Sequence, residues 1–159
     1  MVEKFHEELK QLKKDVIAMG KLAKDMLQKS VEALKKQDPE LSNWVKSKKS
    51  LIAKMDSDIE TESLRLIALY QPMAKDMRTI ACCLKMNTYL TRIGRYGKDI
   101  AKVNDDMGNK PHFKKLVSIP HMSEIVCKMI DDALTAFQTE DISDGGWILN
   151  GESAGHFRF

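Results

Sequence analysis

A heptad pattern in the first 37 residues restricts this chain to a helical bundle or coiled coil more than any other feature does. Apolar and small residues recur there at alternating spacings of four and three, and they are Phe5, Leu9, Leu12, Val16, Met19, Ala23, Met26, Ser30 and Ala33. The positions between them are mostly Lys, Glu, Gln and Asp. Such a seam needs an apolar partner along its whole length. We therefore predict one long helix over residues 5–37, about 50 Å in length at the standard helical rise.

A second helix is predicted directly after the first. Asp38 can cap the new N-terminus and Pro39 fits its first turn, so this dipeptide ends one helix and starts another. The apolar seam that follows includes Lys48 and Glu62. Either both side chains reach solvent at the edge of the bundle, or Glu62 meets a polar group on a neighbouring helix. We predict a single helix over residues 39–70.

A third helical run, over residues 71–103, is predicted to lie at the centre of the bundle because it has two apolar stripes. One stripe contains Met77, Ile80, Leu84 and Thr91, and the other contains Met86, Leu90, Ile93, Gly97 and Ile100. Two stripes require packing surfaces on two sides of the helix. Pro72 suits the first helical position, and Asp76 suits the positive end of the helix dipole. Short connections force antiparallel neighbours, so these three helices form an up-down-up bundle.

The sequence also indicates an internal repeat. A fourth helix is predicted after Pro120 from the apolar residues Met122, Ile125, Val126, Met129, Ile130, Ala133, Leu134 and Phe137. An offset of 103 residues pairs Met26 with Met129, and the same offset pairs Trp44 with Trp147. We divide the chain into a complete three-helix repeat at 1–104, a linker at 105–118, the start of a second repeat at 119–144, and an irregular tail at 145–159.

The apolar face of the fourth helix needs a cover that the predicted bundle does not specify. The helix can fold back onto the stripe of Met86, Leu90, Ile93 and Ile100, or it can pack against a second chain. Leaving its large side chains in water is excluded, because burying each one is worth about 1.5–3 kcal/mol. We favour a homodimer with the fourth helices in or beside the interface.

Composition and charge exclude several functional classes. The chain has 31% charged and 6% aromatic residues, and it lacks the alternation of a half-buried strand, so we predict an all-α protein. The net charge of +3 comes from 26 basic and 23 acidic residues interspersed along the helices, which argues against a nucleic-acid partner. No apolar run approaches the roughly 20 residues that span a bilayer, and Met1 does not open a signal peptide. We expect a cytoplasmic protein, peripheral to the membrane at most.

No sequence motif indicates catalysis. The chain contains no phosphate-binding loop, nucleophile elbow or zinc-protease motif, and no Ser, Cys or Lys has an evident base beside it. Cys82, Cys83 and Cys127 have neither metal-binding nor disulfide spacing, which is typical of a reduced compartment. His112, His121 and His156 are interpreted as surface histidines. We therefore predict that the protein is not an enzyme and needs no cofactor.

Two segments of the third helical run resemble the PhoU family of phosphate-signalling proteins. Gln71-Pro72-Met73-Ala74-Lys75-Asp76-Met77-Arg78 is similar to the family segment Q-P-x-A-x-D-L-R, and Leu90-Thr91-Arg92-Ile93-Gly94-Arg95 is similar to L-E-R-I-G-D. The resemblance covers residues 5–142. It implies a PhoU-like helical fold and a cytoplasmic, non-enzymatic regulator of phosphate uptake and phosphate-starvation signalling. The implied partners are the ATPase subunit of the phosphate ABC transporter, a membrane sensor kinase, and further copies of the chain. The candidate partner-binding residues are Gln71, Pro72, Asp76, Arg78, Arg92 and Arg95.

The sequence departs from the family pattern at the motif with which some members of the family bind metal. That motif has two carboxylates four positions apart, and here Thr91 and Arg95 occupy those positions. Asp99 is the nearest carboxylate, and Arg95 can pair with it one turn away. A hydroxyl and a guanidinium do not replace two carboxylates, so we predict that no metal binds.

Two further functional classes remain as alternatives. One is a helical adaptor unrelated to phosphate, which the signalling phenotype of a deletion would distinguish. The other is a metal-dependent helical protein that uses Glu3, His6, Glu62 and Asp99, which elemental analysis would distinguish. Glu3 and His6 have the spacing of one half of a di-iron ligand set, but a solvated terminus is the simpler interpretation.

Overall fold

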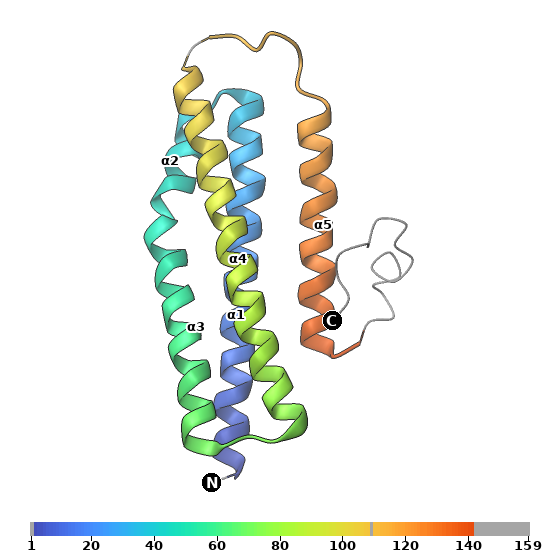
Figure 1. The fold of residues 1–159 in the computed structure, drawn as a ribbon. Helices are drawn as coiled ribbons and strands as arrows, with labels where there is room; N and C mark the ends of the chain where they lie inside the picture. The colour runs from blue at the N-terminus through green and yellow to red at the C-terminus, as the bar shows by residue number, and fades with distance from the viewer. Residues whose placement is uncertain (1, 109, 142–159) are drawn as a thin grey trace.

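The structure is a computed structural model that describes residues 2–108 and 110–141, and in these residues it contains five helices and no strand (Figure 1). The helices are α1 (Val2–Lys36), α2 (Pro39–Ser47), α3 (Lys49–Tyr70), α4 (Ala74–Met107) and α5 (Ser118–Thr139). Helices α1 and α4 lie side by side, with α2 and α3 on one side and α5 on the other (Figure 1). No helix among the described residues is long and apolar enough to cross a membrane. The predicted all-α bundle is confirmed.

Helix α1 buries the whole of the predicted heptad seam, from Phe5 to Ala33. The helix ends at a left-handed residue, Gln37, after which the Asp38 N–H donates to the Ala33 carbonyl at 3.0 Å. The Asp38 carboxylate then accepts hydrogen bonds from the backbone N–H groups of Glu40 and Leu41, at 2.9 and 3.2 Å. The predicted end of one helix and capped start of the next are therefore both confirmed.

The prediction of one helix over residues 39–70 is wrong, because a turn at Lys48 separates α2 from α3. The Lys48 N–H donates to the Val45 carbonyl at 3.1 Å, which tightens the chain before α3 begins. The turn places the Lys48 ammonium 5.1 Å from the centre of the Trp44 ring. A charge that would otherwise lie on an apolar seam thus gains a cation–π contact.

Helix α4 begins at Ala74, two residues later than predicted, because Gln71 is left-handed and Met73 is extended. The two predicted stripes form one broad buried face that contains Ile80, Cys83, Asn87, Leu90, Thr91, Gly94, Gly97, Ala101 and Asn104. Leu84 and Met86 are only half-buried, at the edges of this face. Contact with α1, α2 and α3 explains the width of the face, since α4 packs against all three helices.

Helix α5 folds back onto the bundle, but it packs antiparallel along α1 and not on the predicted stripe of α4 (Figure 1). The reason lies on α1, where Gly20 leaves space that the Leu134 side chain fills. Ion pairs between Lys24 and Asp131 at 2.8 Å, and between Lys13 and Glu140 at 2.9 Å, border this contact. The paired Trp147 of the predicted repeat lies outside the described residues.

We expect Gly20→Leu to detach α5 from α1. A Cβ atom at Gly20 would lie 2.5 Å from Leu134 Cδ2 and 3.1 Å from its Cγ, so a whole leucine side chain displaces Leu134. Hydrogen exchange should show α5 amide protection falling by about tenfold or more, while α1 to α4 keep theirs. Lys21→Leu, at the exposed neighbouring position, is the matched control. Unchanged protection of α5 in Gly20→Leu would contradict this packing.

Candidate partner-binding surface

The candidate residues of the segment 71–78 lie at the end of the bundle where α3 meets α4. Gln71 closes α3 with its N–H donating to the Ile67 carbonyl at 3.1 Å, and Pro72 behind it is buried. The half-buried Asp76 faces His6 of α1, with 3.6 Å between the carboxylate and the ring. Of these four candidate residues, only Gln71 and Arg78 are exposed. Pro72 thus supports the junction and offers no contact area to a partner.

The same junction also contacts the end of α5. Glu140, the left-handed residue after α5, accepts hydrogen bonds from Lys75 at 2.7 Å and from Lys13 at 2.9 Å. The Lys75 and Lys13 ammonium groups lower the pKa of Glu140 to about 2. Because this folded-state pKa is depressed, the contribution of the Glu140 ion pairs to the stability of the fold is complete above the ordinary pKa of a glutamate. That contribution is lost as the pH falls through about 2. The Glu140 carboxylate therefore joins the end of α5 to α1 and to the segment 71–78.

The second candidate segment lies along the middle of α4. The Thr91 hydroxyl is buried and donates to the Asn87 carbonyl at 2.9 Å, so it does not face solvent. Arg92 is exposed and donates to the Tyr96 hydroxyl at 3.2 Å. Asp99, with which Arg95 can pair one turn away, pairs instead with the adjacent Lys98 at 2.8 Å. Arg95 is consequently exposed and without an ion-pair partner in the described part of the chain.

Arg92 and Arg95 line a groove of about 520 Å³ between α3 and α4. Asp56 and Glu60 of α3 line the opposite side, and within the described residues no ion pair crosses the groove. At its base the Asn87 side-chain amide donates to the Asp56 carboxylate at 2.7 Å and to the Asp56 carbonyl at 3.0 Å. The groove therefore presents charges of both signs that form no ion pair with each other. The hydrogen bonds of Asn87 hold α3 and α4 together at its base. Sequence reasoning missed Asp56 and Glu60, although their spacing of four places them on one helical face.

The six candidate residues do not form one site. Sixteen residues separate Asp76 from Arg92 on a continuous helix, which corresponds to about 24 Å. Gln71, Asp76 and Arg78 mark one end of the bundle, whereas Arg92 and Arg95 belong to the groove on its flank. A partner that contacts both groups must therefore lie along α4.

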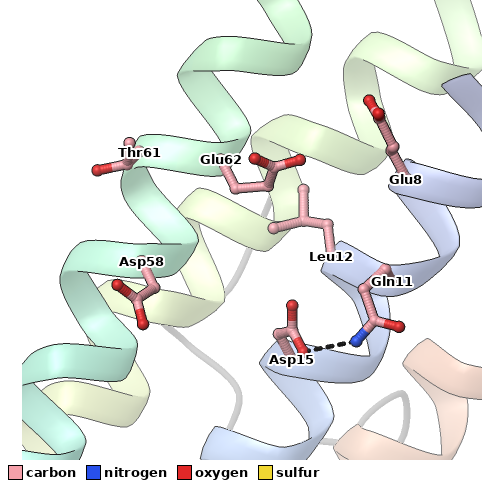
Figure 2. Close-up of a pocket in the computed structure, with 7 residues that line it drawn as sticks. All are labelled: Glu8, Gln11, Leu12, Asp15, Asp58, Thr61 and Glu62. Atoms are coloured by element: carbon pink, nitrogen blue, oxygen red, sulfur yellow. Dashed lines mark hydrogen bonds between the residues drawn. The ribbon is translucent and has the colours of Figure 1, made fainter.

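A second groove, between α1 and α3, is acidic (Figure 2). It has a volume of about 410 Å³ and is lined by Glu8, Gln11, Leu12, Asp15, Asp58, Thr61 and Glu62. Arg65 joins its two sides, because its guanidinium donates to Glu8 of α1 and to Glu62 of α3, both at 2.6 Å. The bond from Arg65 is the main cause that lowers the pKa of Glu8. Glu62 thus pairs with Arg65 of its own helix and not with a polar group on a neighbouring helix, and Arg65 in turn reaches Glu8 of α1.

The described residues hold neither an evident metal site nor an activated nucleophile. No three His, Cys, Asp or Glu side chains between residues 2 and 141, residue 109 apart, come together as a metal ligand set. Burial raises the pKa of the Cys83 thiol to about 12 and also raises the pKa values of Cys82 and Cys127. These thiols therefore remain protonated at neutral pH and are poor nucleophiles. His112 is not a free surface histidine, because its Nε2 donates to the Leu34 carbonyl at 2.7 Å, and His156 lies outside the described residues.

We expect the purified protein to contain less than one iron, zinc or manganese ion per chain. Thr91 is buried against its own helix and Arg95 carries the wrong charge, so the two family ligand positions supply no carboxylate. Inductively coupled plasma analysis of protein purified without chelator measures the metal content. The double variant Thr91→Glu/Arg95→Asp, which restores both carboxylates, is the positive comparison. One bound metal per unaltered chain would contradict the prediction.

These features occur in a chain that is similar to known proteins over most of its length. A family model described as the PhoU domain matches residues 16–103. A phosphate-specific transport system accessory protein PhoU homolog from Aquifex aeolicus is 38% identical over 138 residues, which are 87% of this chain and 62% of that protein. The crystal structure of PhoU from Pseudomonas aeruginosa matches with a TM-score of 0.82 at 30% identity, covering 86% of this chain and 66% of that one.

A second crystal structure, of the phosphate transport system regulatory protein PhoU from Streptococcus pneumoniae, matches with a TM-score of 0.81 at 25% identity and covers 92% of this chain and 69% of that one. The chain spans 62% and 61% of the lengths of two curated relatives that it matches. The matched family region contains α2, α3 and most of α1 and α4, and thus both candidate segments of α4.

Proposed function

This chain belongs to the PhoU family, and we propose that it is an accessory regulator of phosphate uptake and phosphate-starvation signalling. In this proposal it acts in the cytoplasm by binding a component of the phosphate transport system, and it catalyses no reaction. The proposal is supported by relatives that are named phosphate-specific transport system accessory proteins. The raised pKa values of the thiols also favour binding over nucleophilic chemistry.

The mixed-charge groove between α3 and α4 is the surface that we assign to the partner. Arg92 and Arg95 stand across from Asp56 and Glu60 without an ion pair between them, so a bound segment can neutralise both sides. The assignment rests on this one observation, that the described residues form no ion pair across the groove. The ATPase subunit of the phosphate transporter and a membrane sensor kinase are the partners that we propose for it. Gln71, Asp76 and Arg78 would contact the same partner further along α4.

Complementation of a strain that lacks the gene tests both the function and the groove. Deletion should release phosphate-starvation genes from repression at high phosphate, and the unaltered chain should restore repression. Arg92→Ala/Arg95→Ala should fail to restore it while keeping the circular dichroism and melting midpoint of the unaltered protein. Lys10→Ala/Lys14→Ala, which removes two exposed charges of α1, is the matched control and should restore repression.

The outcomes separate the two parts of the proposal. If deletion leaves phosphate signalling and phosphate uptake unchanged, the chain is a helical adaptor unrelated to phosphate. If deletion has the expected phenotype but the double arginine variant restores repression fully, the function stands and the groove is not the partner site.

We also propose a homodimer that buries the outer face of α5. Packing on α1 buries Cys127, Ile130 and Leu134 but leaves Met122, Ile125, Val126 and Met129 exposed. The proposed division of the chain, with a second repeat beginning at residue 119, assigns this face to packing with further helices. A second copy supplies such a surface through the same face, as a two-fold interface requires.

Light scattering over a dilution series should therefore give twice the chain mass at micromolar concentration. Ile125→Glu/Met129→Glu should lower the mass to that of one chain, since two carboxylates are then placed in the apolar contact. Leu64→Glu/Leu69→Glu alters exposed leucines of α3 and should leave the dimer intact. A single-chain mass for the unaltered protein would refute the dimer.

A further inference from the structure

We propose that the segment between α4 and α5 binds the surface of an anionic membrane. The segment crosses one end of the bundle, the end opposite the Gln71 junction (Figure 1). It contains Phe113, which is fully exposed to solvent. Its lysines are Lys110, Lys114 and Lys115, all exposed. A basic loop with a projecting aromatic ring is the combination that lets a soluble domain attach to anionic lipid.

The exposure of Phe113 is fixed by hydrogen bonds on its N-terminal side. The Gln37 side chain at the end of α1 donates to the Lys110 carbonyl, and His112 Nε2 donates to the Leu34 carbonyl at 2.7 Å. Because a carbonyl can only accept, this His112 nitrogen carries a proton. The backbone is thus held against the end of α1 at residues 110 and 112, and the next side chain points away from the bundle.

The apolar surface continues from the loop onto the first turns of α5. Val117, directly before α5, and Ile119, in its first turn, are exposed and follow Phe113 along the chain. Burial of such side chains at the boundary between headgroups and acyl chains is the apolar part of interfacial binding. Phe113 and these residues are all exposed within a short stretch of the chain, and a soft lipid interface can accept them without a preformed pocket.

The charge of the segment selects an anionic surface. Between Asp106 and Glu124 the sequence has three lysines and two histidines and no acidic residue. The acidic residues that precede the segment in the sequence are Asp105, which pairs with Lys46, and the exposed Asp106 at the end of α4. Glu124 lies on α5, and its carboxylate is 3.9 Å from Nδ1 of His121. Within the described residues none of the three lysines forms an ion pair, so they can face lipid phosphates, and each contributes about a fivefold increase in binding near such a surface.

Vesicle sedimentation with the full chain tests this inference independently of the role in phosphate regulation. The protein should pellet with phosphatidylcholine vesicles that contain about 30% phosphatidylglycerol, and much less with phosphatidylcholine alone. Raising the ionic strength to about 0.5 M should weaken binding, because the lysine attraction is then screened. Lys110→Ala/Lys114→Ala/Lys115→Ala should lower the partition coefficient by about 100-fold, and Phe113→Ala by about fivefold or more.

Matched variants distinguish the loop from general charge and hydrophobicity. Lys10→Ala/Lys14→Ala/Lys21→Ala removes three exposed lysines from α1, and Leu69→Ala removes an exposed apolar side chain from α3. Both should bind vesicles as the unaltered chain does. The inference is overturned if the unaltered chain does not pellet with anionic vesicles, or if the loop variants bind as well as their controls. It is also overturned if Phe113→Ala leaves vesicle binding intact and instead changes the mass of the protein in solution, since a second copy would then cover the loop.

Discussion

Gly97→Leu is expected to abolish cooperative folding of the bundle. A Cβ atom at Gly97 would lie 2.9 Å from the backbone carbon and oxygen of Met26 and 3.0 Å from the backbone nitrogen of Leu27. Backbone atoms inside a helix cannot rotate away, so α4 and α1 would have to separate along their contact, which is the most extensive between two helices of the described residues. Even Gly97→Ala should cost about 1–3 kcal/mol, despite its better helix propensity. Urea unfolding followed by circular dichroism measures both variants.

Gly94→Ala is the matched control, one turn earlier on the same helix. A Cβ atom there would meet the end of the Ile52 side chain and would lie 3.5 Å from the Met26 sulfur. The ends of flexible side chains can move, and alanine is favoured over glycine in a helix by about 1 kcal/mol, so this variant should lie within about 1 kcal/mol of the unaltered protein. Adding Ile52→Val removes the terminal methyl group and should relieve the remaining strain. Equal stability of Gly94→Ala and Gly97→Ala would contradict the close approach of α1 and α4.

The period of apolar residues was sufficient to predict α1, because its seam faces one continuous core and every seam position is buried. The same reasoning failed at Lys48 and at α5. A period describes which face of a helix is buried, but it does not say whether a lysine stays on that face or turns to a nearby indole. It also does not identify the packing partner, which for α5 depends on the space above Gly20 of α1.

Buried polar residues explain why the candidate surface was only partly predictable. Asn87 interrupts an apolar stripe of α4 in the sequence and Asn104 follows the stripes, yet both lie on its buried face. Each forms hydrogen bonds between helices, and Asn104 donates to the Ser42 hydroxyl at 2.8 Å and to the Asp38 carbonyl at 3.2 Å. Such a pairing depends on tertiary contacts that spacing within one helix cannot show. The arginines of the groove were predicted as candidates from a family motif, whereas the carboxylates facing them required the structure.

Leu90→Ala should destabilise the protein far more than Leu84→Ala, although the sequence placed both residues on buried stripes. Leu90 is 6% exposed and belongs to the main core, so its truncation should cost about 2–5 kcal/mol. Leu84 is half-buried and lines the mixed-charge groove, where water can replace the lost methyl groups, so its truncation should cost about 1 kcal/mol. Urea unfolding measures the difference, with Leu64→Ala on the exposed surface of α3 as the control. Equal losses for the two α4 variants would mean that the groove is closed in solution and that Leu84 belongs to the core.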